Sequence, residues 1–271
     1  QEEEFALLQE GQILFSFLHL ASARDLTKAL LERKIRTVGY ETVELDDGRL
    51  PLLAPMSQIA GKMAVQIGSC LLVRNNGGRG ILLSGIAGAR PGTVVILGAG
   101  NVGSSAAMMA AGLRAKLIII NRNIDRLKHL EETLPGSITT LASTAYNIES
   151  AVYEADLLIG AVLVAGAKPP VLVSEEMVKK MKAGAVIIDV SVDQGGCVET
   201  IRVTTHSEPT FVKHGVVHYG VTNIPGIVPH TSTWVLSDVT LPYALLLADL
   251  GFEEAVRTHR ALAKGVNTYG G

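Results

Sequence analysis

Short apolar runs alternate with helical patterns along most of this 271-residue chain. The runs are rich in Val, Ile and Leu without regular polar alternation, which is typical of strands buried on both faces. The segments between them repeat apolar residues at helical spacing. This alternation predicts an α/β fold with a doubly wound parallel sheet. Strands are expected at 13–18, 37–41, 93–97, 116–120, 137–141, 156–164, 185–190 and 216–220, and helices at 2–10, 24–33, 57–74, 104–112, 123–133, 146–154, from 174, and at 231–250.

Two of these helices carry further signals. Ser57 is a suitable N-cap for the helix at 57–74, and Pro242 is expected to kink the helix at 231–250. Small residues along the first of them predict close backbone packing against a neighbouring helix. These residues are Ala60, Gly61, Ala64 and Gly68.

The glycine-rich turn after residues 93–97 is the strongest chemical signal. An apolar run leads into Gly98-x-Gly100-x-x-Gly103, a helix of small residues follows, and a second apolar run begins at Lys116. This is the order of a dinucleotide-binding Rossmann unit. There the glycines permit the turn, admit the pyrophosphate and let the helix pack, while the helix N-terminus faces the phosphates. The alternative is a glycine-rich turn with only a structural role.

The pair Asn121-Arg122 ends the second strand of this unit. An acidic residue at that place would bind the adenosine ribose hydroxyls of NAD and repel a 2′-phosphate. Asn121 does not repel it, and Arg122 and Arg126 could pair with it. The pattern therefore allows or favours NADP(H). The alternative is that Arg122 is a solvated residue at the start of a helix.

Two titratable residues stand where strands are expected to end. In open α/β sheets, ligands bind beyond the carboxyl ends of the strands. Asp193 lies just past the run 185–190 and is the better active-site candidate, whereas Asp189 lies deeper and is expected to be structural. His19 ends the run 13–18, where a lone histidine is more often a hydrogen-bonded boundary residue.

No metal site is expected. His214 and His218 are four residues apart, but Val216 and Val217 make the segment a strand. Four strand residues span about 13 Å, which is too far for two ligands of one metal ion.

Composition argues against several kinds of partner. The net charge of −2 gives no reason to expect nucleic acid or an anionic membrane. No uninterrupted apolar run reaches the roughly 18 residues of a membrane span. Two cysteines without a C-x-x-C motif fit a reducing, cytoplasmic setting. Because the chain opens with Gln1 and closes without a terminal element, a fragment cut at both ends is expected.

Distinctive short motifs follow one another along nearly the whole chain. They are Phe17-Leu-His-Leu-Ala21, Tyr40-Glu-Thr-Val43, Pro51-Leu-Leu-Ala-Pro-Met-Ser57, Gly77-Gly-Arg-Gly80, Gly98-Ala-Gly-Asn-Val-Gly103, Gly160-Ala-Val-Leu-Val-Ala-Gly-Ala-Lys168, Asp193-Gln-Gly-Gly196, Asn223-Ile-Pro225 and Val228-Pro-His-Thr-Ser232. In this order they resemble the alanine dehydrogenases, which are related to the nucleotide subunit of proton-translocating transhydrogenase. The match is far more specific than the glycine turn alone.

The resemblance implies an oxidoreductase that converts L-alanine to pyruvate and ammonia with NAD(H), and a homo-oligomer, namely a hexamer. His19 matches the catalytic histidine, which overturns its plainer interpretation, and Asp193 matches the catalytic aspartate. Asn121 and Arg122 join the cofactor site by their position after the second strand. The other matching cofactor positions are Ser57, Gly98, Ala99, Gly100, Asn101, Val102, Gly103, Arg126, Ser143, Val162, Leu163 and Asn223.

The resemblance also implies a domain layout. Residues 1–52 form the first part of a substrate domain, 53–229 the dinucleotide-binding Rossmann domain, and 230–271 a return helix with the second part of the substrate domain.

Two departures from the family pattern remain. Asn121 replaces the family's acid, which puts strict NAD specificity in doubt. The family's N-terminal segment, with the Arg and Lys that bind the substrate carboxylate and keto oxygen, is not in this sequence, so the chain alone is expected to be inactive. A transhydrogenase-type nucleotide subunit and a non-catalytic dinucleotide-binding fragment are the alternative functions.

Overall fold

The computed structural model describes residues 2–162 and 168–270 and forms two compact units. We call residues 57–227 the insert unit, and residues 1–56 together with 228–271 the flanking unit. Each unit has its own sheet and its own apolar core. The chain thus leaves the flanking unit after residue 56 and returns to it at residue 228.

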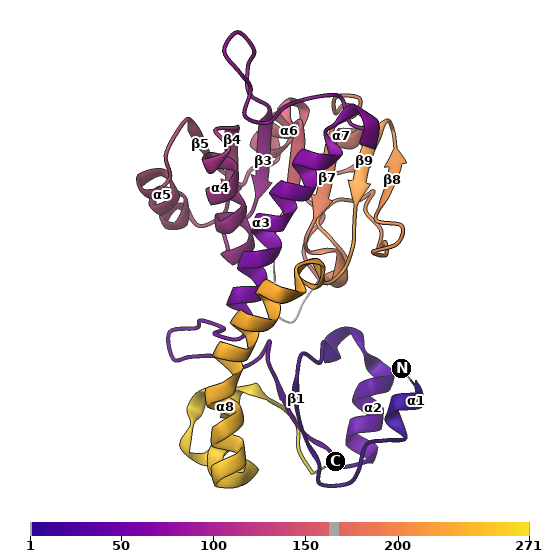
Figure 1. Ribbon diagram of the computed structural model, residues 1–271, viewed down its shortest axis with the longest axis vertical. Helices are drawn as coiled ribbons and strands as arrows, with labels where there is room; N and C mark the ends of the chain where they lie inside the picture. The colour runs from indigo at the N-terminus through magenta and orange to yellow at the C-terminus, as the bar shows by residue number, and fades with distance from the viewer. Residues whose placement is uncertain (1, 163–167, 271) are drawn as a thin grey trace. The chain divides into compact units, whose positions relative to one another are not determined.

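The insert unit is built on a seven-stranded sheet with the order β5-β4-β3-β6-β7-β9-β8 (Figure 1). Neighbouring strands run parallel, except that β8 pairs antiparallel with β9. Because the order proceeds outward from β3 in both directions, the predicted doubly wound sheet is confirmed. The strands are β3 (Thr93–Leu97), β4 (Lys116–Asn121), β5 (Ile138–Ala142), β6 (Leu157–Gly160), β7 (Val186–Asp189), β8 (Thr210–Lys213) and β9 (Val216–Tyr219).

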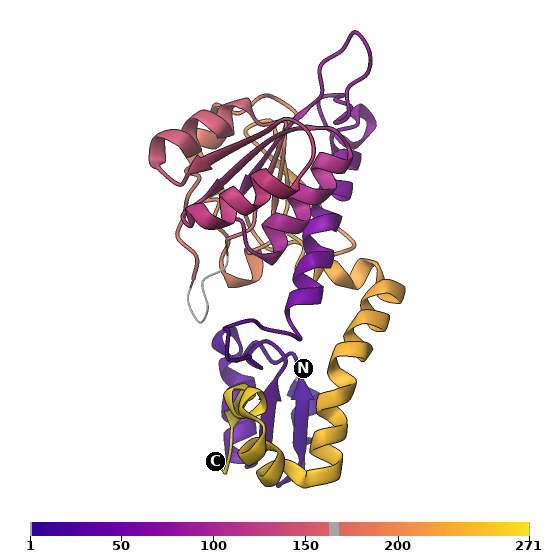
Figure 2. The same cartoon turned by 90° about the vertical axis from the view of Figure 1, so that its left-hand side faces the viewer.

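Helices cover both faces of this sheet (Figure 2). The side chains of β3 alternate between two cores, with Val94 and Ile96 in one and Val95 and Leu97 in the other. The first core also contains residues of α3 (Ala54–Leu71), α4 (Asn101–Gly112) and α5 (Ile124–Thr133). The second contains residues of α6 (Ala145–Glu154) and α7 (Glu175–Lys179).

Small residues bring α3 very close to its neighbours, as predicted. A Cβ on Gly61 would lie 2.1 Å from the carbonyl oxygen of Val102 in α4. A Cβ on Gly68 would lie 2.5 Å from the side chain of Leu157 in β6. Larger residues at these places would push α3 away from the sheet.

The flanking unit is built on a three-stranded sheet in which β1 (Ile13–Ser16) pairs parallel with β2 (Arg36–Gly39). The third strand, β10 (Val266–Thr268), pairs antiparallel with β2. The helices of this unit are α1 (Glu2–Phe5), α2 (Arg24–Glu32), α8 (Pro229–Thr258) and α9 (Arg260–Gly265). The buried core residues are Val38, Val43, Leu52, Leu247, Phe252, Ala255 and Leu262.

The expectations for Ser57 and Pro242 were wrong, and one strand was missed. Helix α3 begins at Ala54, so Ser57 lies inside it instead of capping it, because Pro55 is well tolerated in a first helical turn. In α8 the non-helical dihedral angles occur at Gly251 (φ 72°), and none are found at Pro242. Strand β8 was not anticipated; it is joined to β9 by a two-residue turn with positive φ at both central residues.

Helix α8 is long and apolar enough, by length and composition, to cross a membrane, although the sequence contains no uninterrupted apolar run of that length. Only 11% of its most apolar 18-residue stretch is buried. Polar residues such as Asp238 interrupt that surface. The helix therefore presents an apolar surface that its own unit does not cover.

Candidate functional site

The glycine-rich turn between β3 and α4 is fixed by backbone contacts. Gly98 has φ 106°, and a Cβ on it would lie 2.3 Å from the carbonyl oxygen of Ala161. A Cβ on Gly103 would lie 1.9 Å from the carbonyl oxygen of Gly98. Both positions require glycine for the protein's own packing.

Gly100 differs from these two glycines. A Cβ on it would meet only the Arg126 guanidinium, at 3.7 Å. Gly100 is also the N-cap of α4, where no side chain accepts a hydrogen bond from the first turn. The exposed Asn101 and half-buried Val102 continue that turn. A twelve-residue helix thus begins with uncapped N–H groups beside open space, an arrangement that fits the pyrophosphate of a dinucleotide.

Asn121 links this turn to the next helix. Its Oδ1 accepts a hydrogen bond from the N–H of Ala99 at 3.1 Å, and its Nδ2 donates to the carbonyl oxygen of Asn123 at 2.9 Å. Asn123 then caps α5 by accepting from the N–H of Arg126. Arg122 and Arg126 are exposed. The Arg126 guanidinium therefore stands beside the turn, and Arg122 directly follows β4, so a phosphate group bound here could pair with cationic side chains.

The other predicted cofactor residues of the insert unit follow the carboxyl ends of its parallel strands. Ser143 follows β5 and donates its N–H to the carbonyl oxygen of Asn121 at 3.1 Å. Val162 follows β6 and is half-buried, whereas the exposed Asn223 follows β9 with φ 52°. Ser57 is half-buried in α3, and Leu163 lies outside the described residues.

Asp189 organises the loop that carries Asp193. It is fully buried at the end of β7 and accepts hydrogen bonds from the N–H groups of Ser191 (2.9 Å), Cys197 (2.7 Å) and Val198 (3.1 Å). Burial raises the pKa of Asp189, and these hydrogen bonds oppose the rise. The structural role expected for Asp189 agrees with these contacts, and Asp193 is exposed on the loop so held.

His19 stands just past the carboxyl end of β1. Its backbone is left-handed, with φ 49° and ψ 39°, and its exposed ring stacks on Phe17 with centroids 5.9 Å apart. The carboxylate of Glu41 accepts hydrogen bonds from the N–H groups of Leu18 and His19. Glu41 lies in the Tyr40–Val43 motif, but neither its residue type nor its spacing from His19 predicted this contact. His19 and Asp193 belong to different units. As matches to the two catalytic residues of the family they would share one active site, which stays a prediction.

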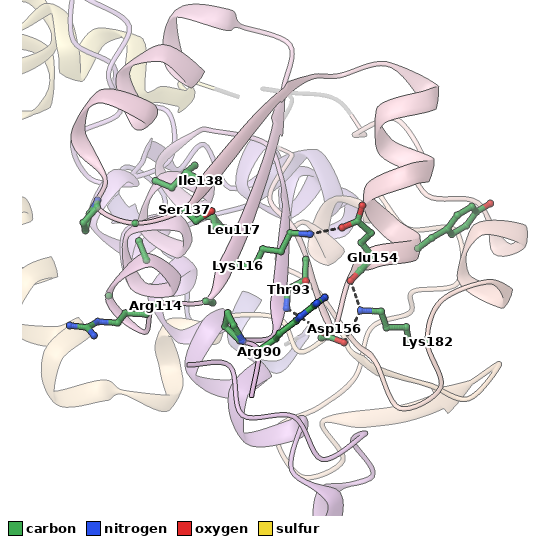
Figure 3. A pocket seen from close by; sticks show the side chains of 17 residues that line it. Arg90, Thr93, Arg114, Lys116, Leu117, Ser137, Ile138, Glu154, Asp156 and Lys182 are labelled. Atoms are coloured by element: carbon green, nitrogen blue, oxygen red, sulfur yellow. Dashed lines mark hydrogen bonds and ion pairs between the residues drawn. The ribbon is translucent and has the colours of Figure 1, made fainter. Parts of the chain in front are cut away.

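A cavity of about 970 Å³ opens at the amino ends of the parallel strands of the insert unit, away from the glycine-rich turn at their carboxyl ends (Figure 3). Thr93 and Lys116, the first residues of β3 and β4, line it. Lys116 pairs with Glu154 at 2.6 Å and Lys182 with Asp156 at 3.0 Å. The carboxyl ends of α4 and α6 lie here, so these cations offset helix dipoles. The predicted cofactor residues lie instead at the carboxyl ends of the strands, which is where open α/β sheets bind ligands.

Across the described residues, no group of three or more His, Cys, Asp and Glu side chains could hold a metal ion. His218 is fully buried, and both ring nitrogens have protein partners. Its Nε2 lies 2.7 Å from Thr200 Oγ1 and its Nδ1 lies 2.9 Å from the carbonyl oxygen of Val216.

Two family models match the chain. The model for the N-terminal domain of alanine dehydrogenase/PNT matches residues 1–60, and that for the C-terminal domain matches residues 64–271. The alanine dehydrogenase of Methanococcus maripaludis is 54% identical over 271 residues, and that of Staphylococcus haemolyticus is 52% identical. Both comparisons cover 100% of this chain and 73% of the relative.

Solved structures give the same relationship. A structure of L-alanine dehydrogenase matches with a TM-score of 0.94 and 51% identity, over 100% of this chain and 74% of that chain. The transhydrogenase from Sinorhizobium meliloti matches with a TM-score of 0.81 over 100% of this chain and 77% of that chain. At 17% identity, that second likeness shows the fold alone.

The open space beside Gly100 generates a first prediction. Gly100→Val should raise the dinucleotide dissociation constant at least tenfold, about 1.4 kcal/mol, because the side chain would occupy space needed by the pyrophosphate. The melting temperature should stay close to that of the wild type, since the substitution meets little of the protein itself. Calorimetric titration with NAD⁺ and NADP⁺ measures the first quantity, and thermal unfolding the second.

Gly112→Val is the matched control, because nothing lies within 4 Å of a Cβ at this last residue of α4. It should leave dinucleotide affinity unchanged. Equal affinities in the Gly100→Val variant and the wild type would contradict the assignment of the turn.

Proposed function

Because this chain belongs to the alanine dehydrogenase/PNT family, we propose that it catalyses the reversible oxidative deamination of L-alanine to pyruvate and ammonia. The observation that carries this proposal is 54% identity to an alanine dehydrogenase across all 271 residues. Candidate reacting residues at the carboxyl ends of two strands agree with it. They are His19 after β1 and Asp193 after β7.

A nicotinamide dinucleotide fits the insert unit. The turn at Gly98–Gly103 and the uncapped start of α4 would receive the pyrophosphate. Residues after β4, β5, β6 and β9 would line the rest of the site. When bound, the nicotinamide ring accepts the hydride that leaves the alanine Cα.

The protein's own residues manage protons and charge in this proposal. Hydride loss from the neutral amine form of alanine leaves an iminium group on the substrate. Addition of water gives a carbinolamine, which collapses to pyruvate and releases ammonia and the hydroxyl proton, together as ammonium. His19 takes the proton of the attacking water and returns a proton to the departing amino group, since imidazole exchanges protons near neutral pH. Asp193 holds the amino group or the attacking water and stabilises the developing positive charge.

Cofactor choice is a finer part of the proposal. We infer that NADP(H) is accepted alongside NAD(H). Asn121 brings no negative charge to the end of β4, and its amide is engaged by the backbone of Ala99 and Asn123. The exposed guanidinium groups of Arg122 and Arg126 are available to a 2′-phosphate.

We also infer that the enzyme works in the cytoplasm as a homo-oligomer, for which the family resemblance implies a hexamer. Helix α8 packs Val239, Tyr243 and Leu247 on the core of its own unit. The opposite side of the helix carries a stripe of exposed apolar residues, namely Trp234, Leu241 and Leu245, which are 65%, 57% and 52% exposed. An apolar stripe of this kind fits burial against a second copy of the chain.

The proposed activity is tested with L-alanine and either cofactor on the full-length protein. Asp193→Asn should lower kcat by about two to three powers of ten, because it removes a charge from the reacting centre. Dinucleotide affinity should be unchanged. Glu208→Gln, which alters another exposed carboxylate of the insert unit, is the control and should keep full activity. A wild-type protein without alanine-dependent cofactor reduction would contradict the proposed function.

Cofactor choice is tested by Asn121→Asp. The new carboxylate should weaken NADP⁺ binding relative to NAD⁺ by about 1–3 kcal/mol, the scale of a badly paired charged group. Arg122→Gln should act in the same direction by removing a partner of the phosphate. Titration of each variant with both cofactors gives the comparison. If the wild type already rejects NADP⁺ as strongly as Asn121→Asp does, Arg122 is only a surface residue.

Self-association is tested by the double variant Leu241→Asp and Leu245→Asp. Two charges on the stripe should shift the protein to smaller species, because they would have to be desolvated in the interface. Light scattering after size-exclusion chromatography measures the molar mass. Val203→Asp, at an exposed valine of the insert unit, should leave the mass unchanged. A monomeric wild type would rule out this role for the stripe.

A further inference from the structure

His19 occupies an unusual backbone conformation for its place in the fold. Its φ of 49° lies in the left-handed region, which side chains other than glycine rarely adopt. Among the described residues, Lys34 and Arg114 share the region but follow helices, where such a residue is common, and His214 lies in the two-residue turn between β8 and β9. Asn223, the remaining one, is of a residue type that tolerates this conformation. His19 instead follows a strand, so a different contact must hold its backbone.

The carboxylate of Glu41 makes that contact. Its Oε1 accepts from the N–H of His19 at 2.6 Å and from that of Leu18 at 3.1 Å, and its Oε2 lies 3.3 Å from the Leu18 nitrogen. Two successive N–H groups therefore converge on one half-buried anion. Hydrogen bonds to a carboxylate are shorter and roughly twice as strong as those between neutral groups.

Aromatic packing supports the ring of His19. The imidazole of His19 stacks on Phe17 with 9° between the planes. Phe17 meets Tyr40 edge to face with centroids 5.1 Å apart, and Tyr40 precedes Glu41 in the chain. The segment after β2 thus supports both the backbone and the ring of His19.

We propose that Glu41 is a positioning residue, which holds the His19 backbone in the left-handed turn and so aims the imidazole at the substrate. This inference rests on the proposed function, in which His19 transfers protons. Glu41 itself touches no reacting atom in the proposal. Its effect passes through the two N–H groups, and a displacement of about 1 Å in a reacting group can cost a hundredfold in rate.

The chemistry of the contact distinguishes three substitutions. Glu41→Ala removes both acceptors. Glu41→Asp shortens the side chain by one methylene and withdraws the carboxylate from the two N–H groups. Glu41→Gln keeps an oxygen in the Oε1 position, which receives the shorter hydrogen bonds, and loses the charge and the weaker Oε2 acceptor.

The kinetic test uses the full-length protein. Glu41→Ala should lower kcat for alanine oxidation by about tenfold to a hundredfold. Glu41→Gln should rescue most of the rate and lie within about threefold of the wild type. Dinucleotide affinity should not change, because the cofactor residues lie in the insert unit. Glu44→Ala is the matched control, since Glu44 pairs with Lys264 in the same unit and should keep full activity.

A double-mutant cycle separates positioning from a merely structural role. In a His19→Ala background, Glu41→Ala should change the remaining rate by less than about twofold, because its target is gone. An equal loss in both backgrounds, or no loss with His19 present, would overturn the inference.

NMR gives a reading that does not depend on turnover. The amide protons of Leu18 and His19 should resonate downfield in the wild type and move upfield in Glu41→Ala, together with a change in the His19 ring signals. Unchanged signals would overturn the positioning role. A wild type without alanine-dependent turnover would overturn the proposed function instead, and the NMR signals would still decide whether Glu41 fixes this turn.

Discussion

Backbone packing without room for a Cβ is the constraint on which the insert unit depends. Around the start of α4, Gly103 approaches the carbonyl of Gly98, Gly98 approaches that of Ala161, and Gly61 approaches that of Val102. These contacts join β3, β6, α3 and α4 at one place. Close-packed backbone cannot relax as side chains do, so the first turn of α4 is held rigidly. A rigid set of N–H groups can bind phosphate without a cost of ordering on binding.

Carboxylates fix the loops around both candidate reacting residues by the same physical means. Asp189 accepts three backbone N–H groups from the loop that carries Asp193, and Glu41 accepts two at the turn that carries His19. In each case the candidate residue is exposed, while its own backbone (His19) or the backbone on both sides of it in the loop (Asp193) is held. A reacting side chain can then contact substrate while its orientation stays fixed, which is what a preorganised site requires.

The sequence predicted features that depend on local spacing and missed those that depend on distant partners. Short apolar runs located the parallel strands, and glycine spacing located the turn before α4. Strand β8 was missed because its pairing relies on positive φ at both His214 and Gly215. A histidine does not predict a turn residue with positive φ. Glu41 was missed because its carboxylate meets a backbone 22 residues away, and neither residue type nor spacing encodes such a contact.

Asn121 has a reason to be an amide that is independent of any cofactor. One side of its side chain faces the N–H of Ala99 and the other faces the carbonyl oxygen of Asn123. An amide satisfies both, whereas a carboxylate would set an oxygen against the Asn123 carbonyl and leave that contact repulsive. The local backbone thus satisfies both ends of the amide in this chain. Compared with the acid of the family pattern, Asn121 removes a repulsion without itself attracting phosphate. Any preference for a phosphorylated ribose must then come from Arg122 and Arg126, the exposed cations beside it.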